Sequence, residues 1–310
     1  MKNIIINSVN ISLEKGTIKK PAEKIELNHY GVSGDAHAGP WNRQVSLLGT
    51  ESIGKSEKES GRKIAPGEFA ENITTTGMEL WKAHPLDRFT TGGIELEVTQ
   101  IGKECHGSGC AIFREVGNCV MPKEGIFCRV LSPGILEAGM ILEYHPKIFR
   151  VMVITLSDRA SSGEYEDKSG PRVKELLETH FLNENRKASI ENFLIPDDPQ
   201  KLEGLLHKAK EELVDFVFTT GGTGIGPRDF TPDIAKAYLD KEIPGIMEMV
   251  RMKYGTEKPA ALASRSVAGV MGKSLVFTLP GSVRAVNEYL AEICRSLRHL
   301  AYMLHGLDAH

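Results

Sequence analysis

The amino-acid sequence predicts two domains: an N-terminal, mostly β, barrel-like domain and a C-terminal α/β three-layer domain with a mainly parallel sheet. The length of 310 residues suits two domains of about 150 residues each. Short apolar segments separated by glycine turns fill the first half, a pattern typical of a β-barrel or sandwich. From Ile148 onward, β-type apolar segments alternate with helical ones, which favours a parallel sheet with helices on both faces. We place the boundary at His145-Pro146-Lys147, which gives domains 1–146 and 147–310.

The composition narrows the class of protein. The chain is 41% hydrophobic and 25% charged, as ordinary globular proteins are. Its formal net charge of −3 gives no reason to expect nucleic acid or a membrane as a partner. The N-terminus lacks a cleavage site and no apolar run approaches the ~18 residues of a membrane span, so we expect a cytoplasmic protein. Five cysteines without a disulfide spacing predict reduced thiols.

Two strands and one helix can be placed in the N-terminal domain. Asn3–Leu13 is apolar and β-branched, and Ile94–Ile101 alternates apolar with polar residues. Thr50–Ser60 is polar and is followed by Gly61, which predicts a surface helix that ends there.

Regular alternation of strands and helices continues through the C-terminal domain. The predicted strands are Phe149–Leu156, Ala188–Ile195, Val214–Phe218 and Ser274–Leu279. The predicted helices are Gly170–Leu182, Lys201–Leu213, Pro244–Tyr254 and a last helix that Ser282 caps and that runs to Leu304. Ligands of such sheets bind beyond the carboxyl ends of the strands, so the loops that follow the four strands are expected to gather at one edge. These loops are Ser157–Gly163, Pro196–Pro199, Thr219–Asp229 and Pro280–Ser282.

The loop after the third strand carries the strongest local signal. Four glycines occur within six positions of Gly221–Gly226, which permits positive φ angles and close approach of a ligand to the main chain. Thr231 as N-cap, Pro232 as first helical residue and Asp233 in the first turn predict a helix start. A strand, a glycine loop and a helix N-terminus together suit phosphate. The loop lacks the lysine of a Walker A motif and the helix that follows a Rossmann fingerprint.

These motifs resemble the MogA/MoaB family and its gephyrin-type relatives. TTGGTG followed by RDFTPD is similar to the molybdopterin-binding loop of that family, and SDRASSGEYEDKSG, LIPDD, ASRSVAGV and LPGS follow the family's order over residues 150–305. The resemblance implies a molybdopterin adenylyltransferase, in which the terminal phosphate of the pterin attacks the α-phosphate of Mg-ATP and pyrophosphate leaves. It also suggests a homotrimer.

The resemblance assigns roles to individual residues. Asp197 and Asp229 match the acids that bind Mg²⁺ and act in catalysis. Backbone N–H groups of the glycine loop would cradle phosphate or pterin. The remaining substrate-binding residues that it implies are Ser157, Asp158, Thr220, Gly221, Gly222, Thr223, Gly224, Asp233, Ser264, Pro280, Gly281 and Ser282. Purely structural roles stay open for two acids. Asp233 would also suit the first turn of a helix, and Asp198 would suit a turn before Pro199.

Two segments of the N-terminal domain are rich in chemically active side chains. Gly31–Ser46 places Arg43 in a glycine-rich loop, where it would clamp an anion or cofactor, although a solvated surface loop is the alternative. Cys105 and Cys110 lie among glycines and basic residues, which favours a thiolate. Cys119 and Cys128 have apolar neighbours and are expected to be buried. A zinc site is disfavoured because the spacings do not match CxxC pairs.

The N-terminal half resembles a MOSC domain, the C-terminal domain of molybdenum-cofactor sulfurases. GDAHAG, RQVSLL, GEFAENITTTGMEL, CAIF and EGIFCRVLSPGILEAGM carry the resemblance over nearly all of residues 1–145. It implies a domain that binds or sulfurates the metal-pterin, with molybdenum as a possible ligand and one cysteine that carries sulfur or contacts the metal. Cys110 matches that position best, and Cys105 is second.

Three other interpretations stay open at this point. The C-terminal domain would be a carrier if it held molybdopterin without adenylylating it, against which the retention of both acids argues mildly. A generic nucleotide hydrolase is a second interpretation, and the missing Walker lysine counts against it. The third interpretation concerns the MOSC half, which would be a purely structural partner domain without chemistry of its own.

Overall fold

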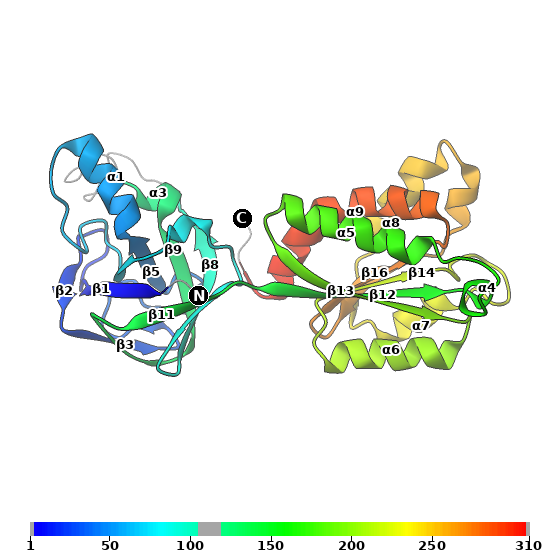
Figure 1. Ribbon diagram of the computed structural model, residues 1–310, viewed down its shortest axis with the longest axis horizontal. Helices are drawn as coiled ribbons and strands as arrows, with labels where there is room; N and C mark the ends of the chain where they lie inside the picture. Colours follow the sequence, from blue (N-terminus) through cyan, green and yellow to red (C-terminus); the bar gives the residue numbers. More distant parts are fainter. Residues whose placement is uncertain (1–2, 105–118, 308–310) are drawn as a thin grey trace. The chain divides into compact units, whose positions relative to one another are not determined.

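The computed structural model describes residues 3–104 and 119–307. The chain folds into two compact units, Met1–Lys147 and Ile148–His310 (Figure 1). Within the described ranges, no helix has the length and apolar character needed to cross a membrane.

The first unit is a closed β-barrel. Its strands pair in the order β11-β7-β8-β9-β5-β6-β1, and β1 pairs again with β11 to close the ring. These strands are β1 (Ile4–Ile11), β5 (Val45–Gly49), β6 (Ile73–Thr76), β7 (Arg88–Thr91), β8 (Ile94–Ile101), β9 (Ile126–Ser132) and β11 (Ile141–His145). β2 (Lys20–Ala22) extends the sheet beside β1, and a separate small sheet has the order β10-β3-β4. Its members are β3 (Lys24–Asn28), β4 (Gly31–Val32) and β10 (Gly134–Glu137). Closure leaves few free strand edges.

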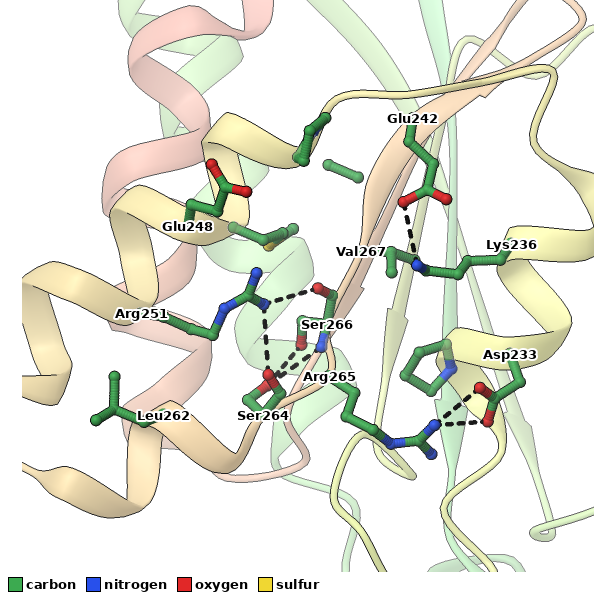
Figure 2. A pocket seen from close by; sticks show the side chains of 14 residues that line it. Asp233, Lys236, Glu242, Glu248, Arg251, Leu262, Ser264, Arg265, Ser266 and Val267 are labelled. Atoms are coloured by element: carbon green, nitrogen blue, oxygen red, sulfur yellow. Dashed lines mark hydrogen bonds and ion pairs between the residues drawn. The ribbon is translucent and has the colours of Figure 1, made fainter.

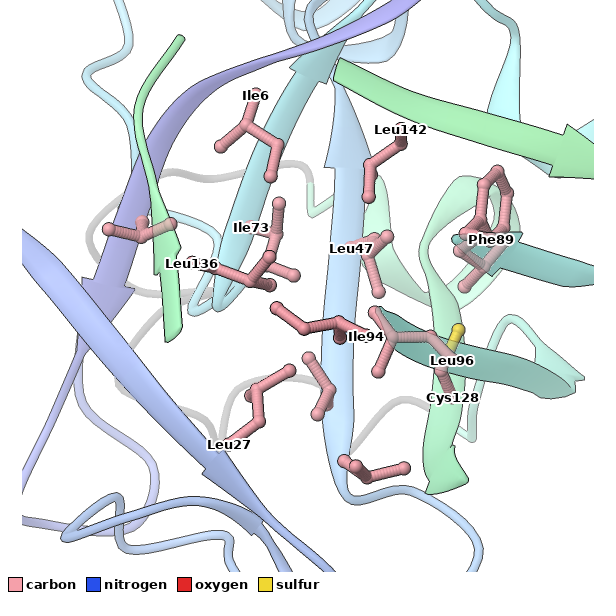
Figure 3. Packing of buried hydrophobic residues seen from close by; sticks show 14 of the residues in the cluster. Ile6, Leu27, Leu47, Ile73, Phe89, Ile94, Leu96, Cys128, Leu136 and Leu142 are labelled. Carbon is pink, nitrogen blue, oxygen red and sulfur yellow. The ribbon is translucent and has the colours of Figure 1, made fainter. Parts of the chain in front are cut away.

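Apolar side chains from the strands fill the barrel interior, as Figure 3 shows. β8 has the predicted bounds, and its apolar side chains are buried in this core. The opposite face of β8 is solvated only in part: Glu95 is partly exposed, whereas Glu97 is only 3% exposed and Thr99 only 4%. Glu97 is stabilised there by Arg129, whose Nε and Nη2 lie 2.9 and 2.6 Å from Oε1.

A helical layer packs outside the barrel strands. It consists of α1 (Thr50–Ser60), η1 (Leu80–Lys82) and α3 (Met121–Glu124). Gly61 ends α1 in the left-handed conformation with φ of 70°, which confirms the predicted helix and its C-terminus. Cys128 is fully buried and free, as expected, whereas Cys119 is half-buried beside the small core under α1.

The second unit is an α/β domain with a six-stranded sheet of order β13-β12-β14-β17-β16-β15. Its strands are β12 (Ile148–Leu156), β13 (Lys187–Ile195), β14 (Phe216–Thr220), β15 (Lys241–Glu242), β16 (Ala268–Met271) and β17 (Ser274–Leu279). β13, β12, β14 and β17 are parallel, while β16 and β15 are antiparallel to their neighbours. The expected parallel sheet therefore holds for four strands, and an antiparallel edge follows them.

Helices lie on both faces of this sheet in Figure 1. They are α4 (Asp158–Ser161), α5 (Ser169–Asn183), α6 (Pro199–Glu211), α7 (Thr231–Tyr238), α8 (Pro244–Gly255) and α9 (Val283–Leu304), with the 3₁₀ helix η3 (Pro259–Ala263) after α8. α5, α8 and α9 lie above the sheet in that view, and α6 and α7 below. Ser282 caps α9 as predicted, since its hydroxyl accepts the N–H of Ala285 at 3.2 Å.

Two helix starts differ from the prediction. Asp198 is the N-cap of α6 and accepts the N–H groups of Gln200 and Lys201, so it does more than form a turn. For α7 the N-cap is Phe230, and the prediction of Thr231 was wrong by one residue. The carbonyl of Phe230 already accepts the N–H of Asp233 at 3.0 Å, which makes Thr231 the first helical residue.

Candidate active site

The carboxyl ends of the four parallel strands lie side by side at one edge of the sheet. Leu156 at the end of β12 is opposite Ile195 of β13, and Thr220 of β14 is opposite both Thr155 and Leu279. The four polar loops that follow these strands therefore begin next to one another, as the alternation of strands and helices predicts.

The glycine loop packs against its neighbours so closely that side chains would not fit. Gly221 has φ of 106°, and a Cβ there would lie 2.3 Å from the carbonyl oxygen of Leu156. Gly222 has φ of 62°, and a Cβ there would lie 2.5 Å from Thr231 Oγ1. The N–H of Gly221 donates to Leu279 at 3.0 Å. The glycines therefore fix the path of the loop across three strand ends.

The second half of the loop is folded around the side chain of Asp229. A Cβ on Gly224 or Gly226 would lie 2.7 or 2.9 Å from Asp229 Oδ2. That oxygen accepts the N–H of Gly226 at 2.8 Å. Asp229 Oδ1 accepts no hydrogen bond from the part of the chain that the structure describes. One carboxylate oxygen thus orders the loop and leaves the other for a ligand.

Three acidic side chains from three loops line one cavity of about 400 Å³, which we call the acidic cavity. They are Asp158 after β12, Asp197 after β13 and Asp229 after β14. Asp158 Oδ1 accepts the N–H of Asp197 at 2.9 Å, and Asp158 also forms an ion pair with Arg228. The rest of the lining consists of Leu156, Ser157, Arg159, Gly222, Gly226, Pro227 and Arg228. The arrangement brings the two acids Asp197 and Asp229 to the same space.

Several other residues that the sequence predicted to bind substrate support the loops around this cavity. The hydroxyl of Ser157 caps α4 by accepting the N–H of Ala160, and that of Ser282 caps α9. Thr220 is fully buried and donates its hydroxyl to the carbonyl of Pro280 at 3.0 Å. Thr223 is also buried. Gly281 lies against the glycine loop, since a Cβ there would be 3.4 Å from Gly221 Cα.

Asp233 and Ser264 line a different cavity of about 440 Å³, shown in Figure 2, which we call the mixed-charge cavity. Arg265 joins it to the glycine loop. Its Nε donates to Gly224 at 2.7 Å, its Nη2 donates to the carbonyl of Asp229, and its Nη1 contacts both oxygens of Asp233 at 2.8 Å. Arg265 is not among the residues predicted from the sequence, although it follows Ser264 directly in the motif ASRS.

The donor set of the acidic cavity suits Mg²⁺. Among the described residues no group of three or more His, Cys, Asp or Glu is placed to hold a metal ion. Mg²⁺ needs no such cage, because it takes one or two carboxylates and completes its shell with water and substrate phosphates. Asp197 and Asp229 supply these carboxylates, and Asp229 has an oxygen that the loop does not use.

The barrel has a cavity of its own, of about 540 Å³, which we call the basic cavity. Arg43 lines it together with Lys15 and Lys103, and Glu104 is the acid among the described lining residues. Trp41 is also part of the lining, and Lys15 Nζ lies 5.1 Å from the centre of its ring. Cys105 and Cys110, the two candidate reactive cysteines, lie outside the described residues.

Asp35, in the same segment as Arg43, belongs to the interior of the barrel. It is 7% exposed, forms a buried ion pair with Lys19 and accepts the side-chain N–H of Asn72 at 3.1 Å. Burial alone would raise the pKa of this carboxyl, but hydrogen bonds from His37 and Lys19 outweigh burial and hold the pKa well below its usual range. Asp35 therefore anchors the segment that presents Arg43.

Comparison with known proteins covers both halves of the chain. Residues 152–299 match the family model described as a probable molybdopterin binding domain, and residues 34–143 match the MOSC domain. The chain is 36% identical over 155 residues to the molybdopterin adenylyltransferase of Helicobacter pylori strain J99, which covers 50% of this chain and 86% of that protein. The chain belongs to the molybdopterin adenylyltransferase family.

Two further proteins are similar to the C-terminal half of the chain. The molybdopterin adenylyltransferase of Escherichia coli K12 is 37% identical over 142 residues, which covers 46% of this chain and 71% of that protein. The solved tungsten cofactor synthesizing protein MoaB from Pyrococcus furiosus is 36% identical, covers 53% of this chain and 99% of that chain, and has a TM-score of 0.46. The two family models and the adenylyltransferase relatives confirm both resemblances drawn from the sequence, to MOSC and to MogA/MoaB.

Proposed function

We propose that the C-terminal domain transfers the adenylyl group of Mg-ATP to molybdopterin. An oxygen of the terminal phosphate of molybdopterin attacks the α-phosphorus of ATP and forms a new P–O bond. The bond from that phosphorus to the oxygen bridging to the β-phosphate breaks, and pyrophosphate leaves with that oxygen. The observation that carries the proposal is the meeting of Asp197 and Asp229 in one cavity beside the glycine loop. Membership of the adenylyltransferase family supports it.

The residues of the acidic cavity have distinct tasks in this proposal. Asp197 and Asp229 would hold Mg²⁺, which when bound neutralises charge on the phosphates. Main-chain N–H groups of the loop at Gly222–Gly224 position the phosphate chain. Arg159 and Arg228 line the same cavity and provide positive charge for the departing pyrophosphate. Phosphoryl-type transfer asks mainly for such positioning and charge neutralisation.

A turnover assay tests the proposal. The purified protein is incubated anaerobically with molybdopterin and ATP, with and without Mg²⁺, and adenylylated molybdopterin is quantified. We expect a product that requires both ATP and Mg²⁺ and that is lost in Asp229→Ala. Tight pterin binding without any product would refute the transferase and favour the carrier, while ATP hydrolysis without pterin would favour a nucleotide hydrolase.

For the MOSC domain we propose that the basic cavity binds the anionic metal-pterin. Three cationic side chains face one acid there, so an anion can bind directly through Arg43, Lys15 and Lys103. The ring of Trp41 offers a surface on which a flat heterocycle can stack. Sulfur or metal chemistry at Cys110 stays a prediction from the family resemblance. A sulfur- or metal-dependent activity that survives in Cys110→Ala would contradict that prediction.

A further inference from the structure

The acidic cavity contains three carboxylates, of which the proposed transfer uses two. In each of these two, one oxygen is bound by a loop N–H group. Asp229 Oδ2 accepts the N–H of Gly226 at 2.8 Å, and Asp197 Oδ2 accepts the N–H of Asp158 at 3.4 Å. Within the described part of the chain, the Oδ1 atoms of Asp197 and Asp229 take part in no hydrogen bond or ion pair. Both acids therefore keep one oxygen for a ligand.

Asp158, the third acid, differs because both of its oxygens have a protein partner. Its Oδ1 accepts the N–H of Asp197 at 2.9 Å. Its Oδ2 forms an ion pair with the guanidinium of Arg228. A carboxylate must offer an oxygen to bind a metal ion, and the positive charge of Arg228 repels a cation from this one. The partners of Asp158 are thus the neighbouring loops and not a ligand.

The contact between Asp158 and Asp197 runs in both directions, because each carboxylate accepts the backbone N–H of the other residue. One further bond joins the same two loops, since the N–H of Ser157 donates to the carbonyl of Ile195 at 2.9 Å. These bonds fix the backbone of Asp197 relative to the end of β12 and restrict the rotation of its side chain. Hydrogen bonds of this kind orient a carboxylate that binds a metal ion.

The ion pair with Asp158 restrains a side chain that is otherwise in water. The side chain of Arg228 is 73% exposed, so packing does little to hold it at the acidic cavity. Holding a long side chain in one conformation costs entropy, and an arginine that is held in advance does not incur that cost when the pyrophosphate forms.

We propose that Asp158 is a positioning residue of the transfer site. Through its Oδ1 it orients Asp197 for Mg²⁺, and through its Oδ2 it holds Arg228 beside the phosphates. Asp158 itself contacts neither the metal ion nor the substrate, in contrast to the substrate contact that the family resemblance implies for it. This inference rests on the proposed adenylyl transfer.

The test compares two double variants whose net charge equals that of wild type. Asp158→Asn with Arg228→Gln removes the ion pair and keeps an oxygen that accepts the N–H of Asp197. Asp158→Ala with Arg228→Gln removes that acceptor as well. Binding of Mn²⁺ in place of Mg²⁺ is measured for the full chain by electron paramagnetic resonance, without substrate. We expect the Kd for Mn²⁺ to stay within about twofold of wild type in the asparagine variant and to rise about tenfold in the alanine variant.

The hold on Arg228 is tested by kinetics. Asp158→Asn alone should lower kcat about threefold, because Arg228 loses its partner. The same substitution made in Arg228→Gln should have no further effect on kcat. Equal losses of kcat in the two backgrounds would overturn the role assigned to this ion pair.

The outcomes separate this inference from the proposed function. Equal Kd values for Mn²⁺ in the two double variants would overturn the orienting role while transfer stands, and equal values that are both raised would make Asp158 a metal ligand. If wild type forms no adenylylated product, the Mn²⁺ titration still tests the orientation of Asp197. A wild type that binds no Mn²⁺ would overturn the inference together with the metal site. The Tm of each variant confirms that the domain is folded.

Discussion

The acidic cavity of the C-terminal domain and the basic cavity of the barrel would deal with anions in opposite ways. The acidic cavity gathers Asp158, Asp197 and Asp229 beside Arg159 and Arg228, so we expect a polyphosphate to bind there with a divalent cation between it and the carboxylates. The basic cavity offers Arg43 and Lys103, to which an anion binds directly. We therefore expect the two sites to differ in whether binding of an anion depends on Mg²⁺.

The largest effect is expected in the acidic cavity from Asp197→Asn. Loss of one of the two charges should lower kcat for adenylylation by about 10²–10³-fold. Asp198→Asn is the matched control, because asparagine caps a helix as well as aspartate does and α6 should be retained. Steady-state turnover of both variants checks the expectation. Equal activity of the two variants would remove Asp197 from the site.

The glycine loop should tolerate no side chain at Gly221. The Cβ of Gly221→Ala would meet the Leu156 carbonyl in a conformation with positive φ, so we expect a loss of about 2–3 kcal/mol in the free energy of unfolding. Gly204→Ala in α6 has no atom within 4 Å of its Cβ and should stabilise the domain by up to about 1 kcal/mol. Urea unfolding measures both. An unchanged free energy of unfolding in Gly221→Ala would mean that the backbone of the loop does not follow the path described for Gly221.

The basic cavity can be probed through Trp41. The chain has two tryptophans, so Trp81→Phe leaves Trp41 as the reporter of the cavity. In that background Arg43→Ala should weaken molybdopterin binding about tenfold, through loss of a charge-assisted contact, and EDTA should leave binding unchanged. Arg62→Ala, which removes a surface arginine paired with Glu68, is the control. Binding that EDTA abolishes would contradict the contrast between the two cavities.

The smallest effect concerns pH and the interior of the barrel. Burial raises the pKa of Glu71, which is 0% exposed and whose Oε2 has no partner among the described residues. A raised pKa means that the folded protein favours the protonated form of Glu71 more than the unfolded chain does. The resulting contribution to the free energy of unfolding is complete at pH values below 4.5, the ordinary pKa of glutamate, and is lost as the pH rises through the raised pKa of the folded state. Glu71→Gln should therefore gain in Tm relative to wild type as pH increases from 4 to 8.

All other titrating groups are the same in Glu71→Gln and in wild type, so their effects cancel in the difference between the two Tm values. A Tm difference between Glu71→Gln and wild type that stays constant across this pH range would show that Glu71 is ionised in the folded barrel.

The two cavities also differ in how far the sequence could predict them. Asp197 and Asp229 lie in the loops that follow β13 and β14, and in a parallel sheet the loops after the strands meet at one edge. Arg43 was found by its chemistry and Lys103 only as a basic neighbour of Cys105, while Lys15 gave no local signal. They reach the same cavity because β9 and β6 join β5, which follows Arg43, to β8 and β1, which precede Lys103 and Lys15. Such long-range pairing has no local pattern in the sequence.

The local sequence pattern was also insufficient where a residue fits more than one structural or functional role. Thr231 and Pro232 fit a helix start, but the helix begins one residue earlier because the carbonyl of Phe230 accepts the first N–H groups. Glu248 and Arg251 look like an ordinary exposed pair on α8, and only the tertiary structure shows that they border one cavity with Ser264.

We propose that Asp197 and Asp229 act together on one Mg-ATP, and a double-mutant cycle tests this joint action. Adenylylation rates are measured for wild type, Asp197→Asn, Asp229→Asn and the double variant under one set of conditions. If the two carboxylates form one site, the double variant should be about as slow as the slower single variant. Rate losses that multiply, with each variant keeping its dependence on Mg²⁺, would contradict a shared site.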